Sequence, residues 1–125
     1  MFPKAIIQNV VSTAQLLDKN NKFDLYTIST IIKNSKYCPE RFSALIIKVE
    51  QPIRSTALLF SNGKIVCVGT KSVQDSQIAI RNFVQIITSA NCLPIEIRAF
   101  KIQNVCVIIF ISRTSYLPGN FFIVY

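Results

Sequence analysis

The residue types that most often carry catalysis are sparse in this sequence. It contains no histidine, so the most common general base and the most common zinc ligand are both missing. The three glycines, Gly63, Gly69 and Gly119, form no phosphate-binding loop. The acidic residues are scattered singly, and no spacing pairs two carboxylates for acid–base work; they are Asp18, Asp24, Glu40, Glu50, Asp75 and Glu96. We therefore expect no catalytic residue, no metal, no cofactor and no enzymatic activity.

The four cysteines also lack a metal-binding pattern. They are Cys38, Cys67, Cys92 and Cys106, and no two of them form a C-x-x-C pair. Met1 is not followed by a basic segment and a long apolar stretch, and the longest apolar run, Val105 to Ile111, is far shorter than the about 20 residues of a spanning helix. We expect reduced, mostly buried thiols in an intracellular protein without a membrane partner.

The overall charge favours binding to a polyanion. The 125 residues include 14 Lys and Arg against six Asp and Glu, a net charge of +8, while half of the chain is apolar. Such a chain can bury one core and still present a basic surface. Four basic residues lie close to the apolar strand segments described below: Arg41, Lys48, Arg54 and Lys64. They are candidate contacts to phosphates, although basic side chains also serve simply as solvated surface.

Hydrophobic patterning predicts alternating strands and helices. Asp24 is a candidate N-cap of a helix to about Lys36, and Ser72 begins a long helix to about Ala90, with Asp75 completing a capping-box pattern. Asn62-Gly63 is a strong hairpin signal. The predicted strands are Ala5–Leu17, Phe42–Glu50, Ser55–Ser61, Lys64–Thr70 and Ile95–Ile111.

The hairpin strands are apolar on both faces. Leu58 and Phe60 point one way, and Ala57 and Leu59 point the other. Two helices cover only one face of a sheet, so the second face would expose a contiguous apolar patch that consists of Val11, Leu58, Phe60, Val66 and Val68. Such a patch is usually a partner site, and the alternative is that another subunit or segment covers it. With basic residues at its rim, it suits the acceptor-lined minor groove of A·T-rich DNA.

A short repeat divides the chain. Ile7-Gln8-Asn9-Val10 recurs as Ile102-Gln103-Asn104-Val105, 95 residues later. We expect one full repeat over residues 1–94 and an incomplete second repeat over residues 95–125.

Four segments resemble the core of the TATA-binding protein family over roughly residues 3 to 106. They are Ile7–Thr13, Tyr37–Ala44, Thr56–Lys64 and Phe100–Asn104. The resemblance implies an α+β fold, a half saddle in which a curved antiparallel β-sheet carries two helices on its convex face. The family is itself a standard example of minor-groove binding with inserted wedges.

The resemblance also implies a role for each matched position. Asn9, with Asn104 as its pseudo-symmetric partner, would contact base edges, and Phe42 and Phe60 would form a kinking wedge. The groove-floor positions would be Val11, Leu58, Val66, Val68 and Cys106, and the phosphate contacts would be Arg41, Lys48, Arg54 and Lys64. The sequence departs from the family where Val68 replaces a usual Thr and Cys106 a usual Val. The turn before Arg54 is one residue longer than the family's turn, and the second hairpin and second long helix have no counterpart.

The leading hypothesis is a nuclear general transcription initiation factor. It would bind and bend A·T-rich promoter DNA, nucleate preinitiation complex assembly with factors of the TFIIA/TFIIB class, and rebuild a full saddle as a homodimer. A second hypothesis is a truncated half-module that serves protein interaction or dimerisation without productive DNA binding. A third is a ligand-binding domain whose helix and curved sheet enclose an apolar cavity.

Overall fold

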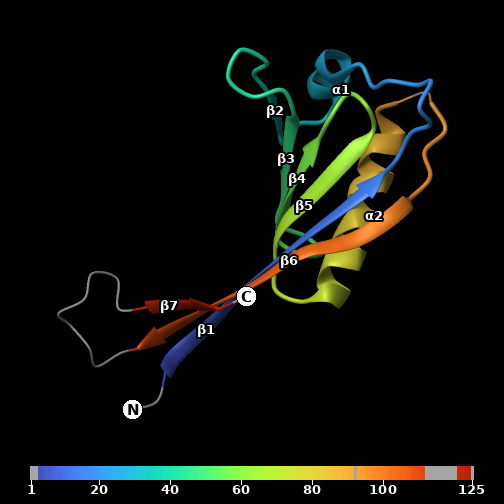
Figure 1. The fold of residues 1–125 in the computed structure, drawn as a ribbon. Helices are drawn as coiled ribbons and strands as arrows, with labels where there is room; N and C mark the ends of the chain where they lie inside the picture. The colour runs from blue at the N-terminus through green and yellow to red at the C-terminus, as the bar shows by residue number, and fades with distance from the viewer. Residues whose placement is uncertain (1–2, 92, 112–120, 125) are drawn as a thin grey trace.

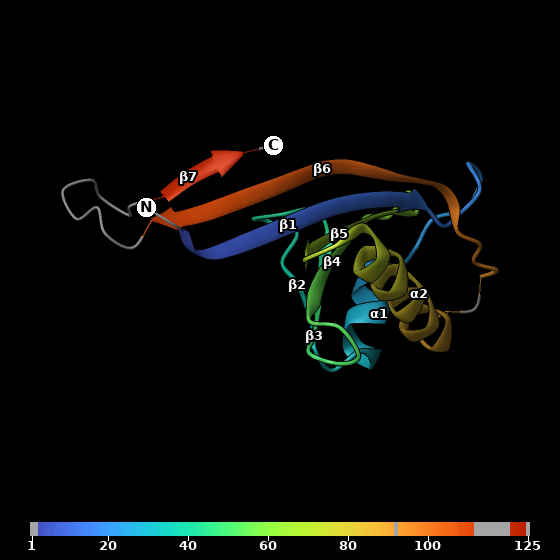
Figure 2. The same ribbon diagram turned by 90° about the horizontal axis from the view of Figure 1, so that it is seen from below.

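An antiparallel sheet with helices on one face organises the computed structural model, which describes residues 3–91, 93–111 and 121–124, with side chains over 9–91 and 93–103. Within these residues seven strands pair in the order β2-β3-β4-β5-β1-β6-β7. They are β1 (Pro3–Gln15), β2 (Ser35–Tyr37), β3 (Leu45–Val49), β4 (Ser55–Leu59), β5 (Lys64–Thr70), β6 (Arg98–Ile111) and β7 (Phe121–Val124). Helices α1 (Leu25–Ile31) and α2 (Val73–Ser89) lie on the same side of the sheet (Figures 1 and 2). The predicted α+β class is confirmed.

Helix α1 begins where the sequence predicts and ends earlier. Oδ1 of Asp24 accepts a hydrogen bond from the Thr27 N–H at 3.2 Å, and the Thr27 hydroxyl, which also bonds this carboxylate, is the main cause that lowers the pKa of Asp24. The prediction that the helix continues to Lys36 is wrong. Ile32 is already extended, and Ser35–Tyr37 pairs with β3 as the edge strand β2, so sheet pairing replaces the last predicted helical turn.

Helix α2 is capped as predicted and supplies much of the core. Oγ of Ser72 accepts a hydrogen bond from the Asp75 N–H at 2.9 Å. Ile80, Phe83 and Ile87 are buried against the sheet. They pack on a sheet face whose fully buried side chains are Leu45, Ile47, Ala57, Leu59, Ile65 and Cys67. Complete burial of such side chains stabilises the fold by about 1.5–3 kcal/mol for each large aliphatic residue.

A small polar cluster lies inside this core. The Ser12 and Ser76 hydroxyls share a hydrogen bond that links β1 to α2. Burial raises the pKa of the neighbouring Cys67 thiol to about 11, so the thiol stays protonated at neutral pH. Cys67 and the half-buried Cys38 are both free thiols, as expected, whereas Cys92 lies outside the described residues and the side chain of Cys106 is not described.

Most predicted strands appear with shifted ends. The first begins earlier and ends at Gln15, Phe42 precedes its strand, which begins at Leu45, and β6 begins at Arg98. The strand predicted over Ser55–Ser61 ends at Leu59, and Lys64–Thr70 is found as predicted. No helix among the described residues combines the length and the hydrophobicity that a membrane crossing requires.

A bulge interrupts the alternation of side chains along β5 where this strand pairs with β1. Val10 pairs with Thr70 and Ser12 pairs with Cys67, so two steps along β1 match three along β5. Gly69, with φ +90°, is the residue at this irregularity that adopts the left-handed backbone such a bulge needs. Cys67 and Thr70 are therefore both buried opposite Ser12 and Val10, although they lie three positions apart. Asn9 and Val11 reach the opposite face by the normal alternation of β1.

Candidate nucleic-acid interface

The face of the sheet opposite the helices, called the open face below, is apolar and accessible. Leu58, Phe60, Val66 and Val68 are each half-buried, whereas their neighbours Ala57, Leu59, Ile65 and Cys67 are fully buried under the helices. Val11 is half-buried on the same open face. The expectation of a sheet with two apolar faces, only one of them covered by this chain's helices, is confirmed by these burial patterns and by the ribbon in Figure 2.

One cross-strand row runs over the open face with a lysine at each end. Its members are paired in sequence from the edge strand to β6: Lys36, Ile46, Leu58, Val66, Thr13 and Lys101. Five strand spacings of about 4.8 Å make this row roughly 24 Å long. Sequence reasoning missed both lysines, because Lys36 was assigned to a helix and Lys101 was not considered. Only the register between the strands reveals them.

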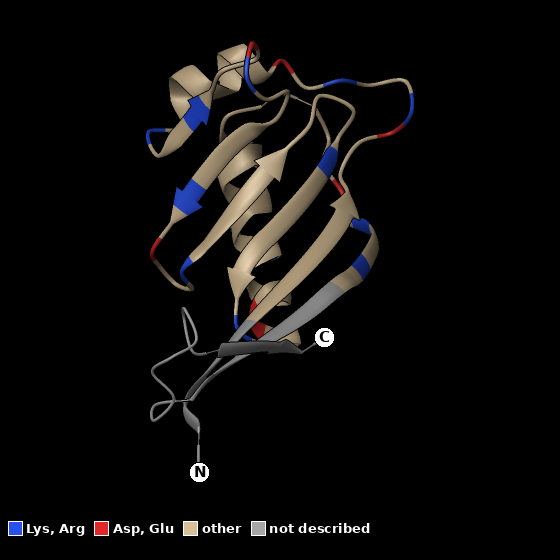
Figure 3. Ribbon diagram, turned by 60° about the vertical axis from the view of Figure 1, so that its left-hand side comes forward, with Lys and Arg blue, Asp and Glu red and all other residues tan. Residues whose placement is uncertain are grey.

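Basic residues flank the open face on two sides (Figure 3). Lys48 lies on β3 opposite Thr56, and Lys64 begins β5 opposite Gln15. Arg41 is exposed in the turn that precedes Phe42. Arg54 is exposed at the β3–β4 connection, where its Nε lies 3.5 Å from Oε2 of Glu50; an exposed pair of this kind is weak and leaves the guanidinium accessible.

Phe42 and Phe60, the predicted wedge pair, are brought into contact. Their ring centroids lie 6.2 Å apart with an interplanar angle of 71°, an edge-to-face arrangement. Phe60 follows β4, and its N–H donates to the Lys64 carbonyl at 2.9 Å, which closes the Asn62-Gly63 hairpin. Phe42 lies in the turn before β3, held by a 3.0 Å hydrogen bond from its N–H to the Cys38 carbonyl, and remains 42% exposed. Two separate connections therefore present one aromatic pair.

The Asn9 side chain is oriented by the bulge in β5. Its Oδ1 accepts a hydrogen bond from the Gly69 N–H at 2.9 Å. A backbone N–H can only donate, so this contact identifies the amide oxygen, and the Nδ2 donor is the group left to reach a bound molecule. The minor-groove edge of an A·T pair carries only acceptors, adenine N3 and thymine O2. A presented donor therefore matches that edge.

The second predicted asparagine lies in β6, and its strand pairing has a two-fold pattern. Asn9 pairs with Cys106, and Val11 pairs with Asn104. The sequence repeat of 95 residues makes Asn104 the counterpart of Asn9 and Cys106 the counterpart of Val11. Asn9 therefore pairs with the counterpart of Val11, and Val11 pairs with the counterpart of Asn9. A two-fold axis through the Val10–Val105 pair produces this arrangement. The side chains of Asn104 and Cys106 lie outside the described residues.

Comparison with protein families settles the relationship. The model of the family described as transcription factor TFIID, or TATA-binding protein, matches residues 4–90, well over half of the chain. The chain belongs to the TATA-binding protein family. Members of this family are not enzymes, so the expectation that this chain is not an enzyme is confirmed.

Individual relatives agree with this assignment. The chain is 44% identical over 98 residues to TATA box-binding protein-like 2 of Mus musculus, and 40% identical over 105 residues to the TATA-box-binding protein of Tetrahymena thermophila. These matches cover 78% and 84% of this chain. They cover only 27% and 40% of the relatives, so the chain spans less than half of their length.

A solved structure supports the fold at the same time. The TATA-binding protein of Methanococcus jannaschii aligns with a TM-score of 0.65 and 31% identity, over 82% of this chain and 57% of that one. The half-saddle architecture implied by the sequence resemblance is therefore confirmed.

Proposed function

We propose that this chain is a transcription initiation factor that binds A·T-rich promoter DNA through the minor groove and bends it. The observation that carries the proposal is the open face, where a row of three apolar side chains and Thr13 ends in a lysine on both sides. Leu58, Val66 and Val68 would pack against the groove floor, with Val11 and Cys106 extending that surface along β1 and β6. Family membership supports the same function.

Base discrimination would come from the asparagine donors. Nδ2 of Asn9 is turned away from Gly69 and would donate to adenine N3 or thymine O2, and Asn104 would do the same across the two-fold pattern. A G·C pair adds the guanine amino donor on this edge, which would oppose a protein donor. The direct readout would therefore favour A·T over G·C without distinguishing A·T from T·A.

Bending would come from the aromatic pair, and register from the cations. Phe42 and Phe60 form one edge-to-face unit, and a ring that enters a base step unstacks it and kinks the duplex. Arg41, Lys48, Arg54 and Lys64 would hold phosphates, which would supply salt-dependent affinity without sequence information. The energy of these contacts would offset the cost of deforming the duplex.

Assembly would use surfaces outside the open face. Nucleation of a preinitiation complex by factors of the TFIIA/TFIIB class, and a nuclear location, follow from the family and are proposed for this chain on that basis. Residues 1–94 and 95–125 are proposed as a complete and an incomplete repeat, a division supported by the two-fold pairing of β1 with β6. A homodimer would supply the missing half of the saddle, and sedimentation as a strict monomer at high concentration would exclude that part of the proposal.

The test uses two duplexes of equal length, one with an A·T-rich centre and one with a G·C-rich centre, each labelled at both ends with a fluorescence donor and acceptor. The expected result is tighter binding to the A·T-rich duplex and a shorter end-to-end distance in its complex. Equal affinity for both duplexes with no change in end-to-end distance would refute the proposal. That outcome would favour a protein-interaction half-module, whose interface would be the same apolar open face.

A further inference from the structure

A groove runs along the free edge of the sheet, between β2 and β3. It has a volume of about 630 Å³ and is lined by three lysines, Lys33, Lys36 and Lys48, together with Asn34, Ser35, Ile46 and Glu50. The groove begins where helix α1 ends early, because the short strand β2 then lies against β3. A hydrogen bond of 3.0 Å from the Lys48 N–H to the Asn34 carbonyl extends this pairing beyond β2.

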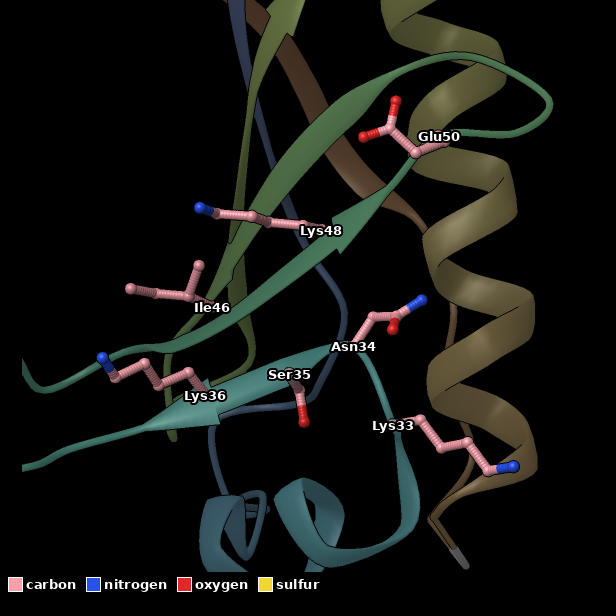
Figure 4. Close-up of a pocket in the computed structure, with 7 residues that line it drawn as sticks. All are labelled: Lys33, Asn34, Ser35, Lys36, Ile46, Lys48 and Glu50. Atoms are coloured by element: carbon pink, nitrogen blue, oxygen red, sulfur yellow. The ribbon is translucent and has the colours of Figure 1, made fainter.

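The side chains of the groove divide between two directions. In Figure 4, Lys36, Ile46 and Lys48 project to the same side, whereas Lys33 projects the other way. Because Lys36 pairs with Ile46, and Ile46 with Leu58, that shared side is the open face. The two lysines therefore border the apolar surface that carries the proposed DNA contact, and Lys33 does not.

The charge of this edge is available for a ligand. Among the described residues, no ion pair involves Lys36 or Lys48. Glu50 is the one acidic residue in the lining, and its exposed carboxylate forms only a weak ion pair, at 3.5 Å, with Arg54 Nε. Lys36 and Lys48 thus present two positive charges beside the apolar side chains of Ile46 and Leu58, against the single carboxylate of Glu50 in the lining.

We propose that the open-face side of the β2–β3 groove, formed by Lys36 and Lys48, is a phosphate-binding site for the backbone of the bound duplex, in which Lys36 joins Lys48 as a direct contact. This inference rests on the proposed function. A DNA minor groove whose floor lies over Leu58 on β4 has that floor two strand spacings, roughly 10 Å, from β2. The backbone that borders a minor groove lies to the side of its floor, so the same placement brings phosphates over Lys36 and Lys48. An acidic protein segment is the competing occupant, and the experiment separates the two.

The test compares the salt dependence of duplex binding in the full chain and in Lys36→Gln, with Lys33→Gln as the matched control. Loss of one phosphate contact lowers the slope of log affinity against log salt by about 0.9. We expect this change for Lys36→Gln on both the A·T-rich and the G·C-rich duplex, with the preference between them unchanged, because phosphates carry no sequence information. Lys33→Gln should leave the slope near that of the parent chain.

Three results would overturn the inference. The first is that the parent chain binds and bends the A·T-rich duplex while Lys36→Gln keeps the full salt slope. This result would leave the proposed function intact and would refute only the phosphate contact in the groove. The second is an equal loss of slope in Lys36→Gln and Lys33→Gln, which would reflect net charge and not a site. The third is weaker binding of a poly-glutamate peptide by Lys36→Gln with an unchanged duplex slope, which would assign the groove to an acidic protein. A parent chain with no affinity for either duplex refutes the proposed function itself.

Discussion

The N–H of Gly69 and the amide oxygen of Asn9 meet at 2.9 Å across the bulge between β5 and β1. The bulge lets Gly69 present its N–H to the Asn9 side chain, and the bond in turn leaves Nδ2 as the outward donor. A backbone irregularity 60 positions away in the sequence therefore determines which end of the amide a DNA base would meet.

Replacement of Asn9 by Ala should weaken binding to the A·T-rich duplex. The lost donor leaves an acceptor on the groove floor unpaired, and the expected loss is about 1–1.5 kcal/mol, roughly tenfold in affinity. Fluorescence anisotropy with labelled duplex measures it. Asn21→Ala serves as the control, because Asn21 lies in the loop between β1 and α1, outside the strands that form the open face. Equal affinities of the two variants would show that Asn9 contacts no base.

Substitution of Gly63 and Gly69, which both have a positive φ, should lower stability in a defined order. Gly69→Ala meets only Ser55 Cα, at 3.8 Å, so its cost is the strain of φ +90°, about 1–2 kcal/mol. Gly63→Ala has a similar φ, and its new Cβ would also lie 2.6 Å from Leu17 Cβ in the core. Urea unfolding should therefore rank the parent chain above Gly69→Ala, and Gly69→Ala above Gly63→Ala. The reverse order for the two variants would contradict the close packing of Leu17 against Gly63.

Removal of either wedge ring should reduce bending. Phe42→Ala and Phe60→Ala each break an edge-to-face contact that holds the other ring, so the double variant should lose less than the sum of the two single variants. The measurement is the end-to-end distance of the bound A·T-rich duplex by energy transfer. Tyr26→Ala is the matched control, because Tyr26 is a 71% exposed aromatic residue on α1, which lies on the helix side of the sheet. Full bending by both phenylalanine variants would exclude the wedge assignment.

The sequence predicted the layers of the fold because its signals are local. The alternation of Leu58 and Phe60 with Ala57 and Leu59 reports which face the helices bury, and the Asp24 and Ser72 caps appear as predicted. Local patterns gave a wrong prediction where hydrogen bonding between strands determines the secondary structure. The helical pattern continued to Lys36, yet Ser35–Tyr37 pairs with Leu45–Ile47 and becomes a strand.

The candidate site was predicted as a set of residues, whereas its geometry was not. Phe42 and Phe60 were paired by family resemblance, and the structure adds their edge-to-face contact. Lys36 and Lys101 could not be found from spacing, because they share a row only through the register of six strands. The hydrogen bond from Gly69 to Asn9 likewise depends on a bulge that the sequence pattern did not predict.

Ionisation of Cys67 should make stability fall at alkaline pH. The fold raises the pKa of this thiol from 9.0 to about 11, because the fully buried thiolate would lose its hydration. Below pH 9 the thiol is protonated in both the folded and the unfolded chain, and its contribution to stability is fully present. Between pH 9 and about 11 only the unfolded chain ionises, so the free energy of unfolding declines, by about 2–3 kcal/mol when the loss is complete.

The Cys67→Ala variant isolates this contribution from the tyrosines and lysines that titrate in the same range. Its free energy of unfolding at pH 8 should be lower than that of the parent chain, because the smaller side chain leaves a void beneath α2. The difference between the two chains should then shrink as the pH rises from 9 to 11, since only the parent has the buried thiol to lose. Urea unfolding at each pH measures both. A difference that stays constant over this range would mean that the thiol ionises as easily in the folded chain as in the unfolded one, and that the Ser12–Ser76 cluster stabilises a thiolate there.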